Sequence, residues 1–161
     1  MPIPPTSYKT RASLLDRLID AAPRVKKEPR PLRTADRQAT RNAIARDLGW
    51  LLNTRTPLSA AEFDTRVLTV IDFGVPDFGQ GSPASERDQR LRALRTEKAI
   101  RAFEPRLRDV NVSIEPAMDS ERSLRMIIEA VMIGDDVGEP VSFETIYDSE
   151  TGQTKIDAEP Y

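Results

Sequence analysis

The sequence predicts an α+β fold, in which about three N-terminal helices precede a four-stranded, mainly antiparallel sheet. Two observations lead to this prediction. Before Pro105, apolar residues recur every three or four positions, which is the period of an amphipathic helix. After Pro105, apolar residues alternate with polar ones, which is the period of a half-buried strand. The chain is therefore expected to change from helices to strands at this proline.

The first predicted helix begins near Thr34, a candidate N-cap, and ends around Asn53 and Pro57. Trp50, near its end, is interpreted as a packing residue, with contact to a partner protein as the alternative. The apolar residues at positions i, i+4, i+7 and i+8 form one face of this helix: Ile44, Leu48, Leu51 and Leu52.

The second predicted helix begins at a capping box, Ser59–Glu62. It is expected to continue through three further apolar residues: Val67, Val70 and Ile71. Residues 72–79 then form a loop, whose glycines suit backbone positions with positive φ.

The third helix is expected to start at Ser82 and Pro83. Four apolar residues are expected to face the core: Leu91, Leu94, Ile100 and Phe103. The other side of this helix is basic and is expected to be solvated, salt-bridged or in contact with a protein. It carries Arg87, Arg90, Arg92, Arg95, Lys98 and Arg101.

Four strands are predicted after Pro105. The first alternates through Val110, Val112 and Ile114, and the second, 124–133, is apolar on both faces near its end and is expected to be central. A turn at 134–139 leads to the third strand, and a turn at Thr151 leads to the last, 153–157. The third strand alternates through Val141, Phe143, Thr145 and Tyr147.

The N-terminal residues 1–34 are predicted to be a mobile segment, and residues 35–161 a single domain. Residues 13–19 form a short amphipathic island, and residues 21–34 are rich in proline and basic residues, as in an extended linker. An apolar island on a linker suits docking to a partner, although it also suits folding back onto its own domain. Its candidate docking residues are Leu14, Leu15 and Leu18.

Composition argues against an enzyme. The sequence contains neither cysteine nor histidine, so it lacks the residues for a Ser–His–Asp triad, a Cys–His pair, a disulfide or an ordinary zinc site. No cofactor, metal or small-molecule substrate is expected. The absence of a signal-peptide pattern and of a long apolar run indicates a cytoplasmic protein that does not insert into a membrane.

Charge is distributed unevenly along the chain. Residues 1–55 contain 12 basic and 5 acidic residues, whereas residues 109–161 contain 3 basic and 13 acidic residues. The asymmetry favours two surfaces for two different partners, or opposite faces that attract each other within one domain.

The most informative stretch is the corner between the last helix and the first strand, residues 103–107. Pro105 lacks a backbone donor and pushes Glu104 out of the helical conformation. Glu104 and Arg106 therefore flank a rigid residue, which suits a docking point for charged groups on another protein. The alternative is that both side chains only solvate a helix–strand junction.

Three other binding functions are weaker interpretations. Acidic residues interrupt the basic helix and aromatic residues are scarce, so nucleic-acid binding is not expected. The sequence Gly79–Gly81 lacks the strand and the lysine of a phosphate loop. Asp135, Asp136 and Glu139 suit a loose calcium site, but a polar turn explains them equally well.

Four motifs, in this order, resemble the TssE family of type VI secretion baseplate subunits, which is similar to the sheath initiator of contractile phage tails. The resemblance covers most of the chain, from Ser13 to about Asp157. The four motifs are Ser13–Leu18 (SLLDRL), Arg46–Arg55 (RDLGWLLNTR), Asp72–Phe78 (DFGVPDF) and Phe103–Leu107 (FEPRL). The family's loop usually has tyrosine where this chain has Phe73.

The resemblance implies a structural role. Glu104, Pro105 and Arg106 would anchor the subunit to the wedge proteins TssF and TssG, with TssK in the same assembly. The last two strands would present an edge that the sheath proteins TssB and TssC extend by β-augmentation. The candidate residues for that edge are Val141, Phe143, Thr145, Tyr147 and Lys155.

Two alternatives remain open. Related proteins have been labelled lysozyme-like, and Glu104 with Asp109 is the pair of carboxylates that a glycoside hydrolase would use. A phage-type contractile tail is the other possible setting. In such a phage-type tail, the amphipathic island at residues 13–18 would have no role.

Overall fold

The computed structural model describes residues 10–12, 17–18, 24, 34–77, 85–117, 123–134, 138–148 and 151–157. It confirms the α+β class: within these residues, helices precede a four-stranded antiparallel sheet with strand order β3-β4-β5-β6. The helices are α2 (Arg37–Asn53), α3 (Ala60–Thr65) and α4 (Glu86–Phe103), with a short 3₁₀ turn η1 (Val70–Asp72). The strands of the sheet are β3 (Leu107–Pro116), β4 (Ser123–Ile133), β5 (Gly138–Asp148) and β6 (Thr154–Asp157).

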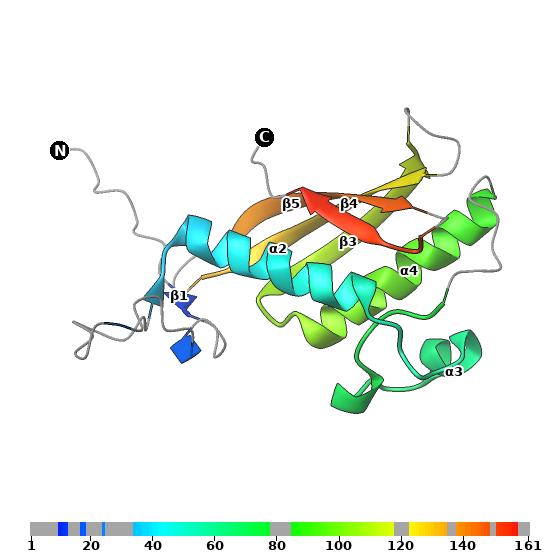
Figure 1. Cartoon of the computed structure of the whole chain (residues 1–161), viewed down its shortest axis with the longest axis horizontal. Helices are drawn as coiled ribbons and strands as arrows, with labels where there is room; N and C mark the ends of the chain where they lie inside the picture. The colour runs from blue at the N-terminus through cyan, green and yellow to red at the C-terminus, as the bar shows by residue number, and fades with distance from the viewer. Residues whose placement is uncertain are drawn as a thin grey trace.

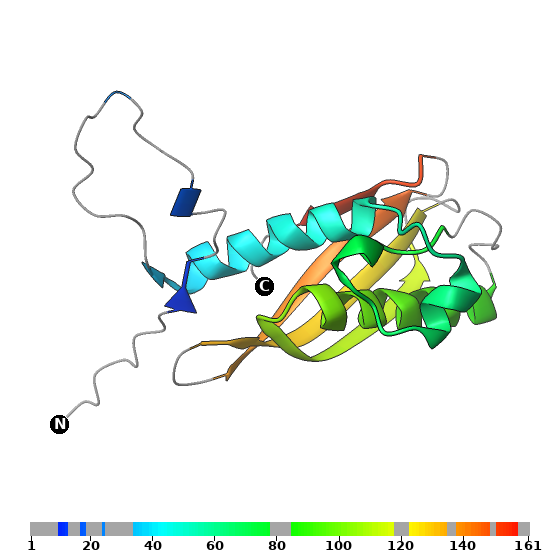
Figure 2. The same cartoon turned by 90° about the horizontal axis from the view of Figure 1, so that it is seen from below.

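The molecule has two layers, in which α2 and α4 lie across one face of the sheet (Figures 1 and 2). The predicted face of α2 is confirmed, because Ile44, Leu48, Leu51 and Leu52 are all buried. They pack with Ile100 of α4 and with the inward residues of β3, β4 and β5 in one core. β4 lies between β3 and β5, as predicted, and alternate residues along it are buried.

The start of α2 differs from the prediction. Thr34 belongs to a two-residue strand, β2 (Thr34–Ala35), which pairs with β1 (Thr10–Arg11). The N-cap is Asp36, whose carboxylate accepts a hydrogen bond from the backbone N–H of Ala39 at 2.8 Å. A carboxylate at this position satisfies a helix N–H that would otherwise lack a partner. The division of the chain at residue 34 stays a prediction.

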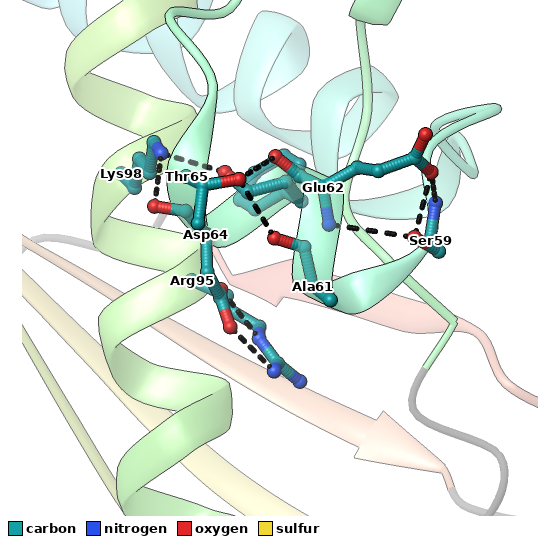
Figure 3. Close-up of polar contacts among 8 residues, drawn as sticks. Ser59, Ala61, Glu62, Asp64, Thr65, Arg95 and Lys98 are labelled. Atoms are coloured by element: carbon teal, nitrogen blue, oxygen red, sulfur yellow. Dashed lines mark hydrogen bonds and ion pairs between the residues drawn. The ribbon is translucent and has the colours of Figure 1, made fainter.

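The capping box Ser59–Glu62 is confirmed, but α3 ends at Thr65. Lys98 of α4 donates hydrogen bonds to three carbonyl oxygens at this end, those of Phe63, Asp64 and Arg66, at 2.6–3.0 Å. Figure 3 shows Lys98 and Arg95 of α4 reaching α3 from the same side. The ammonium group thus satisfies carbonyl oxygens that lack a helical partner at this end of α3. The residues expected to extend it are exposed: Val67, Val70 and Ile71.

The inward face of α4 was predicted correctly for Ile100, which is buried, and for Phe103, which packs against the core, but incorrectly for the two leucines. Leu94 is 61% exposed and Leu91 is partly exposed, whereas Arg92 is buried. The guanidinium carbon of Arg92 lies 4.6 Å from the ring centre of Tyr147, a cation–π contact with β5. The N-cap is Ser85; the expected start at 82–83 lies outside the described residues. Small residues approach the sheet instead of leucines: Ala93, Thr96 and Ala99.

Candidate functional site

The helix–strand corner is built as the sequence predicts. α4 ends at Phe103, and the backbone N–H of Glu104 makes the last helical hydrogen bond, to Ile100 O at 2.8 Å. Pro105 has no N–H with which to continue the helix. The N–H of Leu107 then bonds to Glu104 O at 3.1 Å, which closes a turn and starts β3.

Both charged residues of the corner bind each other. Glu104 is 4% exposed. Its Oε1 accepts hydrogen bonds from Arg106 Nε at 2.7 Å and from the Arg106 backbone N–H at 3.2 Å. Arg106 Nη2 bonds to the second oxygen of Glu104 and to Asp47 Oδ2 of α2, the latter at 2.6 Å. This corner network thus joins the end of α4 to α2.

The network keeps Arg106 charged. Burial of the guanidinium acts to lower its pKa, but the hydrogen bonds and charges of Glu104 and Asp47 outweigh burial and raise the pKa above its ordinary value. Because these charges are satisfied within the chain, they fix the shape of the corner. They leave little unpaired charge for a partner.

An apolar groove of about 380 Å³ lies beside the network. Two of its exposed aromatic residues come from different segments: Trp50 of α2, which is 51% exposed, and Phe73 of the loop after η1. Phe73 packs edge-to-face on Phe103, with ring centres 5.2 Å apart. The lining residues are Asp47, Leu48, Trp50, Leu51, Phe73, Phe103, Glu104, Pro105 and Arg106.

The Trp50 side chain is therefore not a core residue, and its interpretation as one is wrong. The guanidinium carbon of Arg46 lies 5.2 Å from the centre of the Trp50 ring and holds it from one side. Arg46 also forms a salt bridge with Asp47 at 3.1 Å. The indole is thus connected to the corner network through its neighbours in α2.

The loop that carries Phe73 is tied to the end of α2. The N–H of Val75 bonds to Thr54 O at 2.9 Å, and the N–H of Thr56 bonds to Val75 O at 3.1 Å. Gly74 makes this approach possible: its φ is 122°, and a Cβ there would lie 2.5 Å from Thr54 O. The expectation of a positive-φ glycine in this loop is confirmed, and the bonds fix Phe73 at the rim of the groove.

The end of α2 also holds the last hairpin. The Asn53 side-chain amide donates to Thr154 O at 2.9 Å and accepts from the Thr154 N–H at 2.8 Å. Arg55 donates to Gly152 O at 2.8 Å. The motif at 46–55 therefore has two tasks: its first half lines the groove, and its second half positions β6.

The structure thus brings together Glu104, Pro105 and Arg106 with residues that sequence reasoning did not assign to the site. Asp47, Trp50 and Phe73 belong to two other motifs, at 46–55 and 72–78. The sequence contains one indication of these residues, because three separate motifs contain aromatic or acidic residues. Only the fold shows that these residues meet.

The strand residues proposed for sheath contact lie elsewhere. Lys155 on β6 is exposed, whereas the β5 residues point into the core: Val141, Phe143, Thr145 and Tyr147. Their contribution to an interface would therefore come through the backbone. Of the N-terminal candidates, Leu18 is exposed, while Leu14 and Leu15 lie outside the described residues.

The geometry also bears on the other interpretations. A general acid must present a proton to its substrate, but both oxygens of Glu104 accept hydrogen bonds from Arg106. Within the described residues, no group of three or more His, Cys, Asp or Glu side chains is placed to hold a metal ion. Asp135 and Asp136 are outside that part, as are Gly79–Gly81. No described helix is long and apolar enough to cross a membrane.

Exposed aromatic rings in an apolar groove are features that many protein-docking sites share. Residues 38–137 match the family described as baseplate wedge protein gp25, and the chain belongs to this family. A search of curated proteins found no significant match. The family match confirms the resemblance to contractile-machine baseplate subunits.

Proposed function

We propose that this chain is a TssE subunit of a type VI secretion baseplate, which docks on TssF and TssG through the groove. The observation that carries this proposal is the convergence of three motifs on one surface. Trp50, Phe73 and the corner at 103–106 come from separate segments and line a single groove. The aromatic rings of Trp50 and Phe73 are exposed, so packing of the core does not explain their presence at this surface.

In this proposal the apolar residues supply affinity and the corner network supplies orientation. Trp50, Phe73 and Pro105 present apolar surface, and exposed aromatic residues in pockets dominate the binding energy of interfaces. Glu104 and Arg106 are positioning residues, because their charges are bound within the chain. This differs from the expectation that they bind the partner directly.

The second part of the proposal is that the chain starts the sheath built by TssB and TssC. The sheet supports this part, because a sheet with open edges can be extended by a strand of another protein. TssK would belong to the same assembly, at the cytoplasmic face of the inner membrane. The role is structural and requires no cofactor.

The test is co-purification of the full chain with TssF and TssG. We expect capture of the wild type, and at least tenfold weaker binding for Trp50→Ala and Phe73→Ala. A matched control is Ile71→Ala, since Ile71 is also an exposed apolar residue but does not line the groove. Lack of capture by the wild type would refute wedge docking, and equal effects of all three variants would refute the role of the groove.

A further inference from the structure

Helix α4 carries apolar side chains on two sides, and the core uses only one of them. Ala99 and Ile100 are buried against the sheet, whereas Leu91 and Leu94 are exposed. Leucines at positions i and i+3 of a helix lie next to each other and form a ridge on its surface. Packing of the core does not explain this leucine ridge.

Residues 66–73 lie beside the second half of α4, because α4 holds this segment near both ends. Lys98 donates a hydrogen bond to Arg66 O at 2.9 Å, and Phe73 packs on Phe103. Leu94 is one helical turn before Lys98, so the leucine ridge adjoins the segment. Together they form the α4–η1 face, whose apolar residues are Leu91, Leu94, Val67, Val70 and Ile71.

A closed turn presents two residues of this face. In η1, Asp72 Oδ2 accepts hydrogen bonds from the backbone N–H and the hydroxyl of Thr69, at 2.9 and 2.7 Å. The N–H of Asp72 in turn bonds to Thr69 O at 2.9 Å. The polar groups of the turn are thus bound within it, while Val70 and Ile71 are 87% and 78% exposed. Adjoining apolar side chains that stay exposed are typical of an interaction surface.

The charge around the leucine ridge is positive. On a helix, the neighbours of Leu94 are the residues three, four and seven positions away. Besides Leu91, they comprise four cations and one carboxylate: Arg87, Arg90, Lys98, Arg101 and Glu97. The carboxylate of Glu97 is already bound by Arg101. The hydrogen bonds of Lys98 go to carbonyl oxygens, which carry no net charge. The ridge is therefore complementary to an acidic ligand.

We propose that the α4–η1 face binds an acidic amphipathic helix of a partner protein. The backbone of α4 is bonded within the helix and offers no edge to a strand, but its leucine ridge can pack between the side-chain ridges of another helix. Acidic residues beside the apolar stripe of that helix would pair with Arg87 and Lys98. This inference goes beyond docking on TssF and TssG and does not depend on it.

The corner groove has the opposite charge, which separates the two surfaces. Its charged residues are Asp47, Glu104 and Arg106, an excess of one carboxylate. A segment that complements the groove is therefore a poor ligand for the α4–η1 face, and the partner helix is a different segment.

A protein partner also fits this face better than a membrane does. Two exposed carboxylates border the face, those of Glu86 and Asp64. A uniformly anionic lipid surface would repel them, whereas a helix places its charges only opposite the cations.

Selection from a phage-displayed library of randomised helical peptides, about 18 residues or five turns long, tests this proposal on the full chain. The enriched peptides should be acidic, with apolar residues three and four positions apart. Their binding should weaken at least tenfold for Leu94→Ala and Val70→Ala, which remove apolar contact, and for Arg87→Glu, which reverses a charge. Alanine is a good helix former, so Leu94→Ala should fold, which circular dichroism checks.

Matched controls come from the sheet. Ile146→Ala and Arg108→Glu change an exposed apolar residue and an exposed cation that lie on β5 and β3, and they should bind the peptides as the wild type does. Equal weakening by these controls would overturn the assignment to the α4–η1 face. So would enriched peptides that are neutral or basic, or a failure to enrich any peptide whose binding requires Leu94.

Two further measurements separate the rival outcomes. Binding of the full chain to vesicles of phosphatidylglycerol and phosphatidylcholine, lost in Leu94→Ala, would replace the protein partner by a membrane. Capture of TssF and TssG by Leu94→Ala should equal that by the wild type, and its loss would show that the face belongs to the wedge site. Absence of capture by the wild type itself refutes the proposed function and leaves the peptide result to decide this inference.

Discussion

Two of the arginine–carboxylate contacts in this protein differ mainly in the burial of the acid. At the corner, the Glu104 side chain is 5% exposed and binds Arg106. At the contact of α3 with α4, the Asp64 side chain is 43% exposed and binds Arg95 through two hydrogen bonds of 2.9 and 2.8 Å (Figure 3). The chemistry of the two pairs is the same, but their surroundings are not.

Because of this difference, removing one partner of the corner pair should lower the free energy of unfolding more than removing one partner of the exposed pair. A buried carboxylate has given up its hydration and depends on its partner, whereas an exposed one regains water when the partner is lost. The corner network should therefore hold the groove in one shape. The Asp64–Arg95 pair should only adjust how α3 lies on α4, since the buried Phe63 provides the main contact.

The largest expected effect is that of Arg106→Ala. It leaves the buried Glu104 carboxylate without its guanidinium, so the free energy of unfolding should fall by about 3 kcal/mol. Urea unfolding at neutral pH, followed by circular dichroism, measures this loss. The double variant Glu104→Gln/Arg106→Met removes both charges and should lose less than Arg106→Ala alone. A loss below about 0.5 kcal/mol for Arg106→Ala would show that the corner is solvated.

The corner itself could be predicted from the sequence because Pro105 acts locally. A proline after a helical stretch ends the helix regardless of what packs around it. The buried face of α2 was predictable for a similar reason, since Ile44, Leu48 and Leu51 keep a helical period. The change of period after Pro105 correctly located the sheet.

The groove could not be predicted, because its walls are distant in sequence. Helical spacing does not show that Trp50 lies outside the core, since the groove that it lines is completed by Phe73 in a remote loop. The same limit explains α4. Hydropathy favoured Leu94 as a core residue, but the helix approaches the sheet through Ala99 and Arg92, whose guanidinium stacks on Tyr147.

A smaller effect is expected for Arg95→Ala. The pair with Asp64 is bidentate but exposed on the acid side, so its removal should lower the free energy of unfolding by about 0.5–1 kcal/mol. The matched control is Arg90→Ala on the same helix, where both partners of the Glu86 pair are exposed and lie 3.7 Å apart. Urea unfolding should show almost no change for this control. A loss for Arg95→Ala equal to that for Arg106→Ala would contradict the role assigned to burial.

The smallest effect is the pH dependence of the Asp64–Arg95 pair. The hydrogen bonds from Arg95 hold the pKa of Asp64 below its ordinary value of 3.8. A carboxyl group whose pKa is lowered by folding stabilises the protein above its unfolded pKa, and this contribution is lost as the pH falls through the folded pKa. The difference in unfolding free energy between wild type and Arg95→Ala should thus be constant near neutrality and shrink below about pH 4.

Because the Asp64 side chain is 43% exposed and thus screened by water, the part that disappears should be about 0.5 kcal/mol or less. Urea unfolding of both proteins between neutral pH and the acid limit of folding measures it, and salt should reduce it further. A difference that stays constant down to low pH would mean that Arg95 stabilises α3 through its packing on α4 and not through the carboxylate. The contrast between the two networks would then lie in geometry as well as in burial.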